Sequence, residues 1–167
     1  MIDPTVFDNL KVIVEGYIYD LDLEKEISVI NRSDLIDLAR MSRSYLITFS
    51  NIEKSPSSVT FEIEMKHKQL SGELQETILY PVCHIKLTLQ EEINGKEYDE
   101  LLLRKLKKLW GDEHLIKLFV TKEITSPIKN YQHQYQICFN TTYGEDDIEA
   151  LLQIVDQSIS LLRTMTR

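Results

Sequence analysis

The chain has 167 residues, of which 43% are hydrophobic, with a formal net charge of -8 at pH 7. This length and composition predict a single domain over residues 1–167 with an ordinary core. The acidic balance argues against nucleic-acid binding and against docking on anionic lipid, because both need a cationic surface. No apolar run approaches the ~20 residues that span a bilayer, the start does not resemble a signal peptide, and two cysteines form no disulfide framework. A reduced, cytoplasmic protein is the simplest interpretation.

The first 40 residues are ambiguous. Several apolar residues of 6–17 fit helical spacing, but the segment 11–21 is rich in Val, Ile and Tyr, which favours a strand. We interpret it as a short lead-in and a strand over about 10–20, closed into a hairpin by a second strand around 26–31. Whether residues 4–14 are helix or strand stays open. Ser33 is then predicted to cap a short helix that ends near Arg40 and points Leu35, Ile36 and Leu38 inward.

Alternation of apolar and polar residues predicts the strands that follow. It is clearest over 59–65 and recurs over 45–49 and 85–89, and two further strands are expected around 115–123 and 132–141. Such alternation, with one face of the sheet exposed to solvent, is typical of an antiparallel sheet. The positions expected to point inward are Tyr45, Ile47, Phe49, Val59, Phe61, Ile63, Met65, Ile85, Leu87 and Leu89.

Two amphipathic helices complete the prediction. The first, over 98–110, should bury Leu102, Leu103, Leu106, Leu109 and Trp110. The second, over 144–167, carries one stripe of Ile148, Leu152, Val155, Ile159 and Leu162 and another of Ala150, Ile154, Leu161 and Met165. These stripes cover roughly 200° of the helix, against the ~100° that one packed face needs. The sequence therefore predicts an α+β fold: a predominantly antiparallel sheet of five to seven strands, helices on one face and a long C-terminal helix.

From Ser33 onward, the predicted order of helix, three strands, helix, two strands and helix resembles that of the small acidic, dimeric chaperones of type III secretion systems. The resemblance lies in element order and carries no residue motif, and the predicted N-terminal hairpin departs from it. The order also loosely resembles helix-grip (START-like) domains, in which a curved antiparallel sheet wraps a long C-terminal helix. Fold analogy of this kind does not assign function.

Few residues suggest chemistry. Asp20, Asp22 and Glu24 alternate with leucines, so on a strand they would place three carboxylates on one face, about 6–7 Å apart. Hard cations such as Mg2+ prefer oxygen ligands, whereas the alternative is a solvated hairpin end. Cys83 is expected to be a buried structural thiol and His133 a hydrogen-bonded histidine at the edge of the core. No GxSxG, P-loop, HExxH or CxxC pattern appears, no cofactor is expected, and a non-catalytic role is favoured.

Four residues of the 98–110 helix form the only dense basic cluster: Arg104, Lys105, Lys107 and Lys108. Helical geometry places them opposite the leucine stripe, on the outer face. The structural interpretation, which is favoured, is a solvated surface. The functional interpretation is a contact for an acidic segment of a partner.

The leading hypothesis is a non-catalytic interaction protein, an adaptor or chaperone-like binder with a protein partner, which forms a homodimer through its C-terminal helix. The proposed interface residues are Ile154, Ser158, Leu161 and Met165. The alternative is that this stripe packs against the 98–110 helix of the same chain. The competing hypotheses are a metal-dependent enzyme that uses Asp20 and Asp22, and a helix-grip-like binder of a small apolar ligand with a cavity lined by Phe61, Met65, Tyr135 and Phe139.

Overall fold

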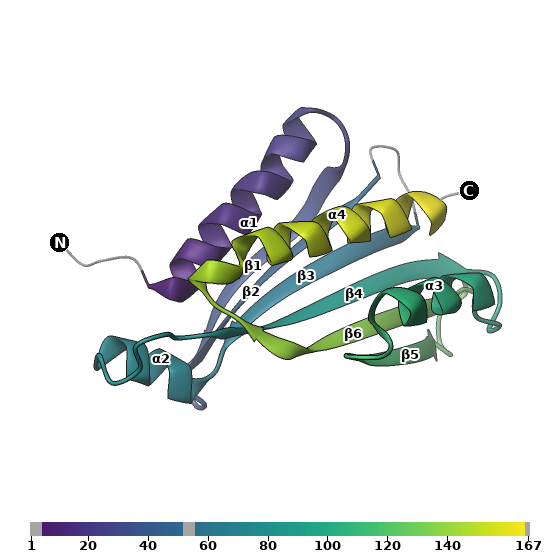
Figure 1. The fold of residues 1–167 in the computed structure, drawn as a ribbon. Coiled ribbons are helices and arrows are strands. Elements are labelled where there is room, and N and C mark those ends of the chain that lie inside the picture. The colour runs from purple at the N-terminus through teal and green to yellow at the C-terminus, as the bar shows by residue number, and fades with distance from the viewer. Residues whose placement is uncertain (1–4, 52–55, 166–167) are drawn as a thin grey trace.

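The computed structural model describes residues 5–51 and 56–165, which form a six-stranded antiparallel sheet with helices against one face (Figure 1). This confirms the predicted α+β fold. The elements are α1 (Val6–Leu23), β1 (Ser28–Asp37), β2 (Ser42–Ser50), β3 (Ser57–Met65), α2 (His67–Leu74), β4 (Cys83–Ile93), α3 (Glu100–Trp110), β5 (Leu115–Lys122), β6 (Tyr131–Tyr143), a short 3-10 turn (Glu145–Asp147) and α4 (Ile148–Met165). The strand order is β1-β2-β3-β4-β6-β5. None of the described helices is long and apolar enough to cross a membrane.

The strand predicted over about 10–20 is wrong, because this segment belongs to α1. The Thr5 hydroxyl caps the helix by accepting a hydrogen bond from the backbone N–H of Asp8. Val and Ile disfavour a helix only weakly, so burial of an apolar stripe at helical spacing outweighs residue type. The buried residues of this stripe are Val6, Phe7, Leu10, Val14 and Ile18. Residue 4, and residues 166 and 167 of the predicted final helix, lie outside the described residues.

The helix predicted from Ser33 to Arg40 is also wrong. The strand expected around 26–31 runs on through Asp37 as β1 and pairs with β2, and residues 38–41 form the turn between them. The three residues expected to point inward are instead 55%, 64% and 79% exposed: Leu35, Ile36 and Leu38. Leu35 and Ile36 lie in an exposed edge strand and Leu38 lies in the hairpin turn, so these apolar residues do not form the buried face of a helix.

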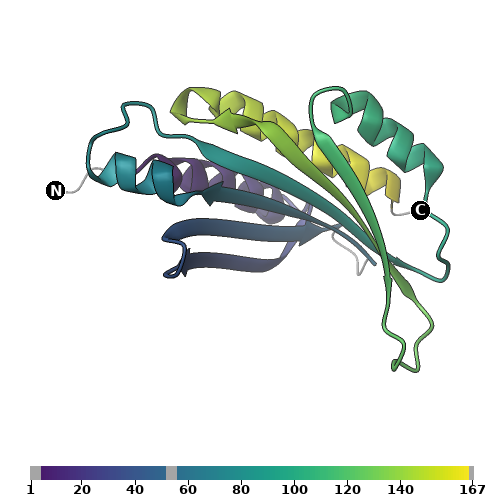
Figure 2. The ribbon, with the colours of Figure 1, turned by 90° about the horizontal axis from the view of Figure 1, so that it is seen from below.

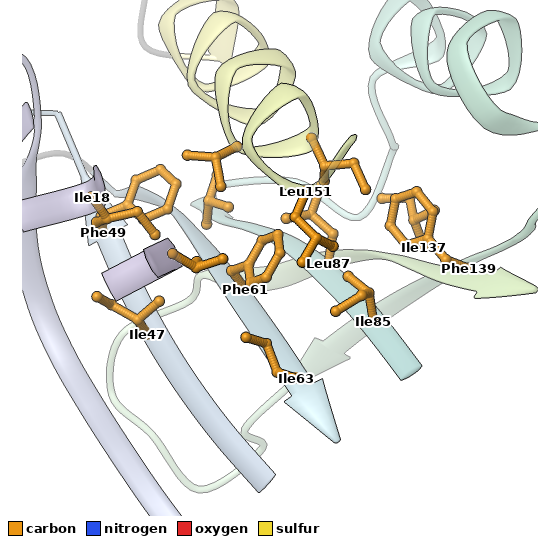
Figure 3. Packing of buried hydrophobic residues seen from close by; sticks show 14 of the residues in the cluster. Ile18, Ile47, Phe49, Phe61, Ile63, Ile85, Leu87, Ile137, Phe139 and Leu151 are labelled. Carbon is orange, nitrogen blue, oxygen red and sulfur yellow. The ribbon is translucent and has the colours of Figure 1, made fainter. Parts of the chain in front are cut away.

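The core lies between the sheet and helices α1 and α4. All ten positions predicted to point inward from β2, β3 and β4 are at most 2% exposed. Figure 3 shows Phe61 and Leu87 on neighbouring strands beneath α4, with Leu151 of that helix above them. The buried face of α3 includes fewer residues than predicted, since Leu103 is only partly buried and Leu109 is 43% exposed.

The first and last helices lie side by side on the sheet. Tyr17 of α1 donates a hydrogen bond of 2.5 Å to the carboxylate of Asp156 of α4, across 139 positions of sequence. The sheet is twisted, so β5 and β6 run in a different direction from β1 and β2 (Figure 2). Helix α1 packs on β1 and β3, α4 packs on β3 and β4, and α3 lies over the β5 end of the sheet.

A polar network joins α1 to the edge of the sheet. The guanidinium of Arg43 on β2 donates to Asp8 of α1 at 2.7 Å and to Asp34 of β1 at 3.2 Å. The Lys11 ammonium lies 2.5 Å from the same Asp34 carboxylate. Burial by itself raises the pKa of both carboxyls, but hydrogen bonds and positive charge from Arg43 and Lys11, with Thr5 at Asp8, hold each pKa below its ordinary value.

We expect this network to make the protein less stable in acid. A carboxyl whose pKa is depressed by folding stabilises the fold above its ordinary value of 3.8, and this contribution is lost as the pH falls through the folded pKa. Arg43→Met should therefore lower the free energy of unfolding near pH 7 by about 1–3 kcal/mol, and by less near pH 3. Urea titrations at both pH values measure this difference.

The control for this prediction is Arg40→Met in the neighbouring turn. Arg40 also pairs with a carboxylate, that of Asp37 at 3.3 Å, but its side chain is 84% exposed. Exposed pairs contribute little to stability, so this variant should behave like the wild type at either pH. An equal loss of stability at both pH values for Arg43→Met would show that its aliphatic packing matters and its charge does not.

Candidate partner-binding surface

Helix α3 has one buried face and one charged face. Asp99 begins it, because the Asp99 carboxylate accepts a hydrogen bond of 3.1 Å from the backbone N–H of Leu102. Glu100 in the first turn and Lys107 and Lys108 in the last turn have the charges that the helix dipole favours at each end. The buried face consists of Leu102, Leu106 and Trp110.

Both ends of α3 are attached to β6. At the start, the backbone N–H of Asp99 donates to the Tyr135 hydroxyl at 3.1 Å. At the end, the Trp110 ring meets Phe139 edge to face, with 5.5 Å between the ring centroids. Such aromatic pairs contribute about 0.5–1.5 kcal/mol beyond the area they bury. The outer face of α3 is therefore held in place by contacts of both helix ends with the sheet.

The structure places the predicted basic cluster on this outer face. All four side chains are exposed, and none of them forms an ion pair with another residue of 5–51 or 56–165: Arg104, Lys105, Lys107 and Lys108. Since the whole chain carries -8, setting these four positive charges aside leaves -12 on the rest of the molecule. The cluster is thus a cationic surface on an otherwise acidic protein.

Two clefts flank α3. The larger one, of about 370 Å³, separates α3 from the C-terminal half of α4, and the two helices lie side by side in both views (Figures 1 and 2). Its walls are Lys105, Lys108 and Leu109 of α3 and Gln157, Ser160, Leu161 and Thr164 of α4. The smaller one, of about 260 Å³, is lined by Tyr98, Glu100, Leu103, Arg104 and Lys107. The sequence pointed to the lysines and, through the alternative packing of the α4 stripe against the 98–110 helix, to Leu161, but not to the polar residues of the second wall.

The proposed dimer interface on α4 needs correction. Ile154 and Leu161 are 5% exposed and Ser158 is fully buried, with its hydroxyl donating to the Val155 carbonyl at 2.6 Å. These three side chains pack within the chain and leave only Met165 partly exposed. Helix α4 packs mainly on β3, β4 and α1, so the alternative that named α3 as its neighbour holds only along the cleft.

The predicted metal site is not assembled. Asp20, Asp22 and Glu24 lie at the end of α1, where residues two apart point about 200° apart around the helix. The Asp22 carboxylate accepts a hydrogen bond of 2.8 Å from the backbone N–H of Val29. Within the described part of the chain, no group of three or more His, Cys, Asp or Glu residues could hold a metal ion. The prediction failed because it assumed an extended backbone.

A row of polar residues is buried beneath the segment that leads into α3. Ser57, Glu91 and His133 lie opposite one another on β3, β4 and β6, with 1%, 7% and 0% exposure. His133 Nε2 lies 2.7 Å from the Gly95 carbonyl, which confirms the hydrogen-bonded histidine, and its Nδ1 has no partner. Burial, with the nearby Asp99 charge, raises the pKa of Glu91, whereas His133 opposes that rise.

Glu91 was not among the residues predicted to be buried, although it shares the strand parity of the buried Leu87 and Leu89. This strand parity could have predicted that Glu91 is buried. The row is closed to solvent, so it offers no site for a substrate.

The two thiols differ in exposure. Cys83 is fully buried, which confirms the prediction, and burial together with the Glu73 charge raises the pKa of its thiol to about 12. It is therefore protonated at neutral pH and is a poor nucleophile. Cys138 is partly exposed on the opposite face of the sheet, level with Lys86 of β4.

The structure offers no support for a helix-grip cavity at the predicted residues. All four are at most 5% exposed and belong to the hydrophobic core: Phe61, Met65, Tyr135 and Phe139. None of them lines either cleft beside α3. Comparisons of the chain with protein-family models, with curated proteins and with solved structures found no match.

Proposed function

We propose that this protein is a non-catalytic, cytoplasmic interaction protein, an adaptor or chaperone-like binder, and that it recognises an acidic segment of a protein partner through α3. The observation that carries the proposal is the exposed basic cluster of α3, whose four side chains make no ion pair within the described residues. The free thiols of Cys83 and Cys138 fit a reducing compartment.

The charge distribution supports a docking role in two ways. An acidic segment is attracted to the cluster at short range, where salt screens the interaction least. The net charge of -12 on the rest of the molecule repels acidic proteins that approach from other sides. The same charge distribution therefore disfavours binding of an acidic partner away from α3. The proposed partner interface therefore includes α3, since Ile154 and Ser158 of α4 are buried in the core and cannot form an apolar interface of their own.

Charge reversal at two positions of α3 tests this function. We expect Lys105→Glu combined with Lys108→Glu to weaken binding of the partner at least ~10-fold, because each reversal replaces attraction by repulsion. Cross-linking and affinity capture would identify the partner, and titration of the purified partner against each variant would give Kd.

A matched control lies on another face. Lys66 and Lys68 are exposed at the start of α2 and form no ion pair within residues 5–51 and 56–165. Lys66→Glu combined with Lys68→Glu changes the net charge by the same amount and should leave Kd unchanged. If both double variants bind the partner as the wild type does, the basic cluster is only solvated surface.

A further inference from the structure

We infer that the partner segment docks as an amphipathic helix in the cleft between α3 and α4, with its apolar side on Leu109 and Leu161 and its acidic side toward Lys105 and Lys108. The inference rests on the proposed function and adds to it the apolar face, the conformation and the orientation of the segment. The cleft measures about 370 Å³ and is open to solvent.

The apolar part of the site comes from one residue of each wall. Leu109 is 43% exposed, although it belongs to a helix whose other apolar residues in the same turn are buried. Leu161 is 5% exposed, and it lines this cleft from the α4 side. A partner with acidic residues alone would leave the exposed part of Leu109 in water, whereas a helix with an apolar stripe would cover it.

The charged part of the site lies on one wall only. Lys105 and Lys108 belong to α3, while the α4 wall presents Gln157, Ser160 and Thr164, which are uncharged. None of the residues that line the cleft is acidic. This asymmetry selects a helix with carboxylates along the flank that faces α3 and neutral residues along the other flank, which fixes the rotation of the helix about its axis.

The cleft also sets the length of the segment. Residues 157 to 164 of α4 span two helical turns, or about 10 Å. A docked helix of about 10–14 residues would cover this length and protrude by a turn. So short a helix is marginal in water, so it would fold as it binds, at a cost in affinity.

The cleft on the other side of α3 fits the same segment less well. It is smaller, at about 260 Å³, and the Glu100 side chain forms part of its lining. A carboxylate in the wall repels an acidic segment. The larger cleft is therefore the docking site.

The test uses a synthetic 14-residue peptide with leucines at alternating spacings of three and four and glutamates along one flank. A second peptide has the same composition in an order that breaks the apolar stripe. Fluorescence anisotropy measures the affinity of each for the full chain. We expect the amphipathic peptide to bind at least ~10-fold more tightly than the reordered one, because only it covers both leucines.

Two variants locate the bound peptide. Ser160 is exposed in the wall of the cleft, so Ser160→Trp should fill the site without disturbing the core and weaken peptide binding at least ~10-fold. Val12 is 63% exposed on α1, which does not line the cleft, so Val12→Trp should leave the affinity unchanged. Circular dichroism confirms that both variants are folded.

The outcomes separate this inference from the proposed function. If the wild type binds neither peptide, or binds both equally, or if Ser160→Trp binds like the wild type, docking of a helix in this cleft is overturned. Acidic recognition by α3 is then judged by the lysine reversals and the natural partner. If Lys105→Glu with Lys108→Glu also keeps full affinity for that partner, both proposals fail.

Discussion

Replacing both Ile154 and Leu161 by glutamate is expected to unfold the protein at neutral pH. Each side chain is 5% exposed in α4 and belongs to the hydrophobic core. A carboxylate placed at either buried position loses most of its water, at a cost of several kcal/mol. Two such costs approach the ~5–15 kcal/mol that stabilises a typical domain. Far-UV circular dichroism and gel filtration of the double variant measure the loss of structure.

The control keeps the charges and moves them to the exposed side of the same helix. Gln153→Glu combined with Ser160→Glu introduces two carboxylates at exposed positions, so the fold should persist. A folded, soluble monomer of the Ile154→Glu, Leu161→Glu variant would contradict the structure. It would show that this stripe faces solvent, and it would restore α4 as a dimer interface.

Phe61→Ala is expected to lower the free energy of unfolding by about 3–5 kcal/mol. Phe61 is fully buried on the central strand β3, beneath α4 (Figure 3). Truncation of its ring removes apolar contacts on both sides and leaves a cavity that rigid neighbours fill only in part. Urea titration at neutral pH, with the slope compared between variant and wild type, measures the change.

Thr88→Ala provides the comparison. Thr88 lies on the opposite, partly exposed face of β4, in register with Thr60. Its replacement should cost less than about 1 kcal/mol. A similarly small effect of Phe61→Ala would mean that the ring borders empty space, and would return the helix-grip alternative with its internal cavity.

The alternating strands were predictable because burial on one face of a sheet imposes a two-residue period. Val59, Phe61 and Ile63 show that period with a polar residue after each, and the structure buries all three. The pattern holds wherever helices cover the inner face completely. It needs no knowledge of which strand lies beside which.

The N-terminal region was not predictable, because its strand β1 lacks this two-residue period. Asp34 on β1 points to the inner side, opposite Tyr45, where it meets Lys11 of α1 and Arg43 of β2. Ion pairs between distant elements replace apolar contacts there, so β1 lacks the alternation that identifies a strand. The Val and Ile content of α1 then favoured a strand over the helix that forms.

One wall of the candidate site was predictable from the sequence. A dense group of basic residues such as Lys105 and Lys108 is evident in the sequence, and helical spacing places it on the outer face of α3. The second wall of the cleft comes from Gln157, Ser160 and Thr164, whose polar side chains carry no signal of their own. Only the packing of α3 beside α4 gives them a role.

The pairing of α1 with α4 also constrains how the chain acquires its structure. Tyr17 and Asp156 are 139 positions apart, so α1 cannot pack against α4 until every strand of the sheet has been synthesised. Contacts between such distant segments slow folding, because the entropy of closing the loop is lost before the contact forms. During synthesis the first helix leaves the ribosome before the strands and the α4 helix that bury Phe7, Leu10 and Ile18. For that interval the nascent chain is a client for chaperones.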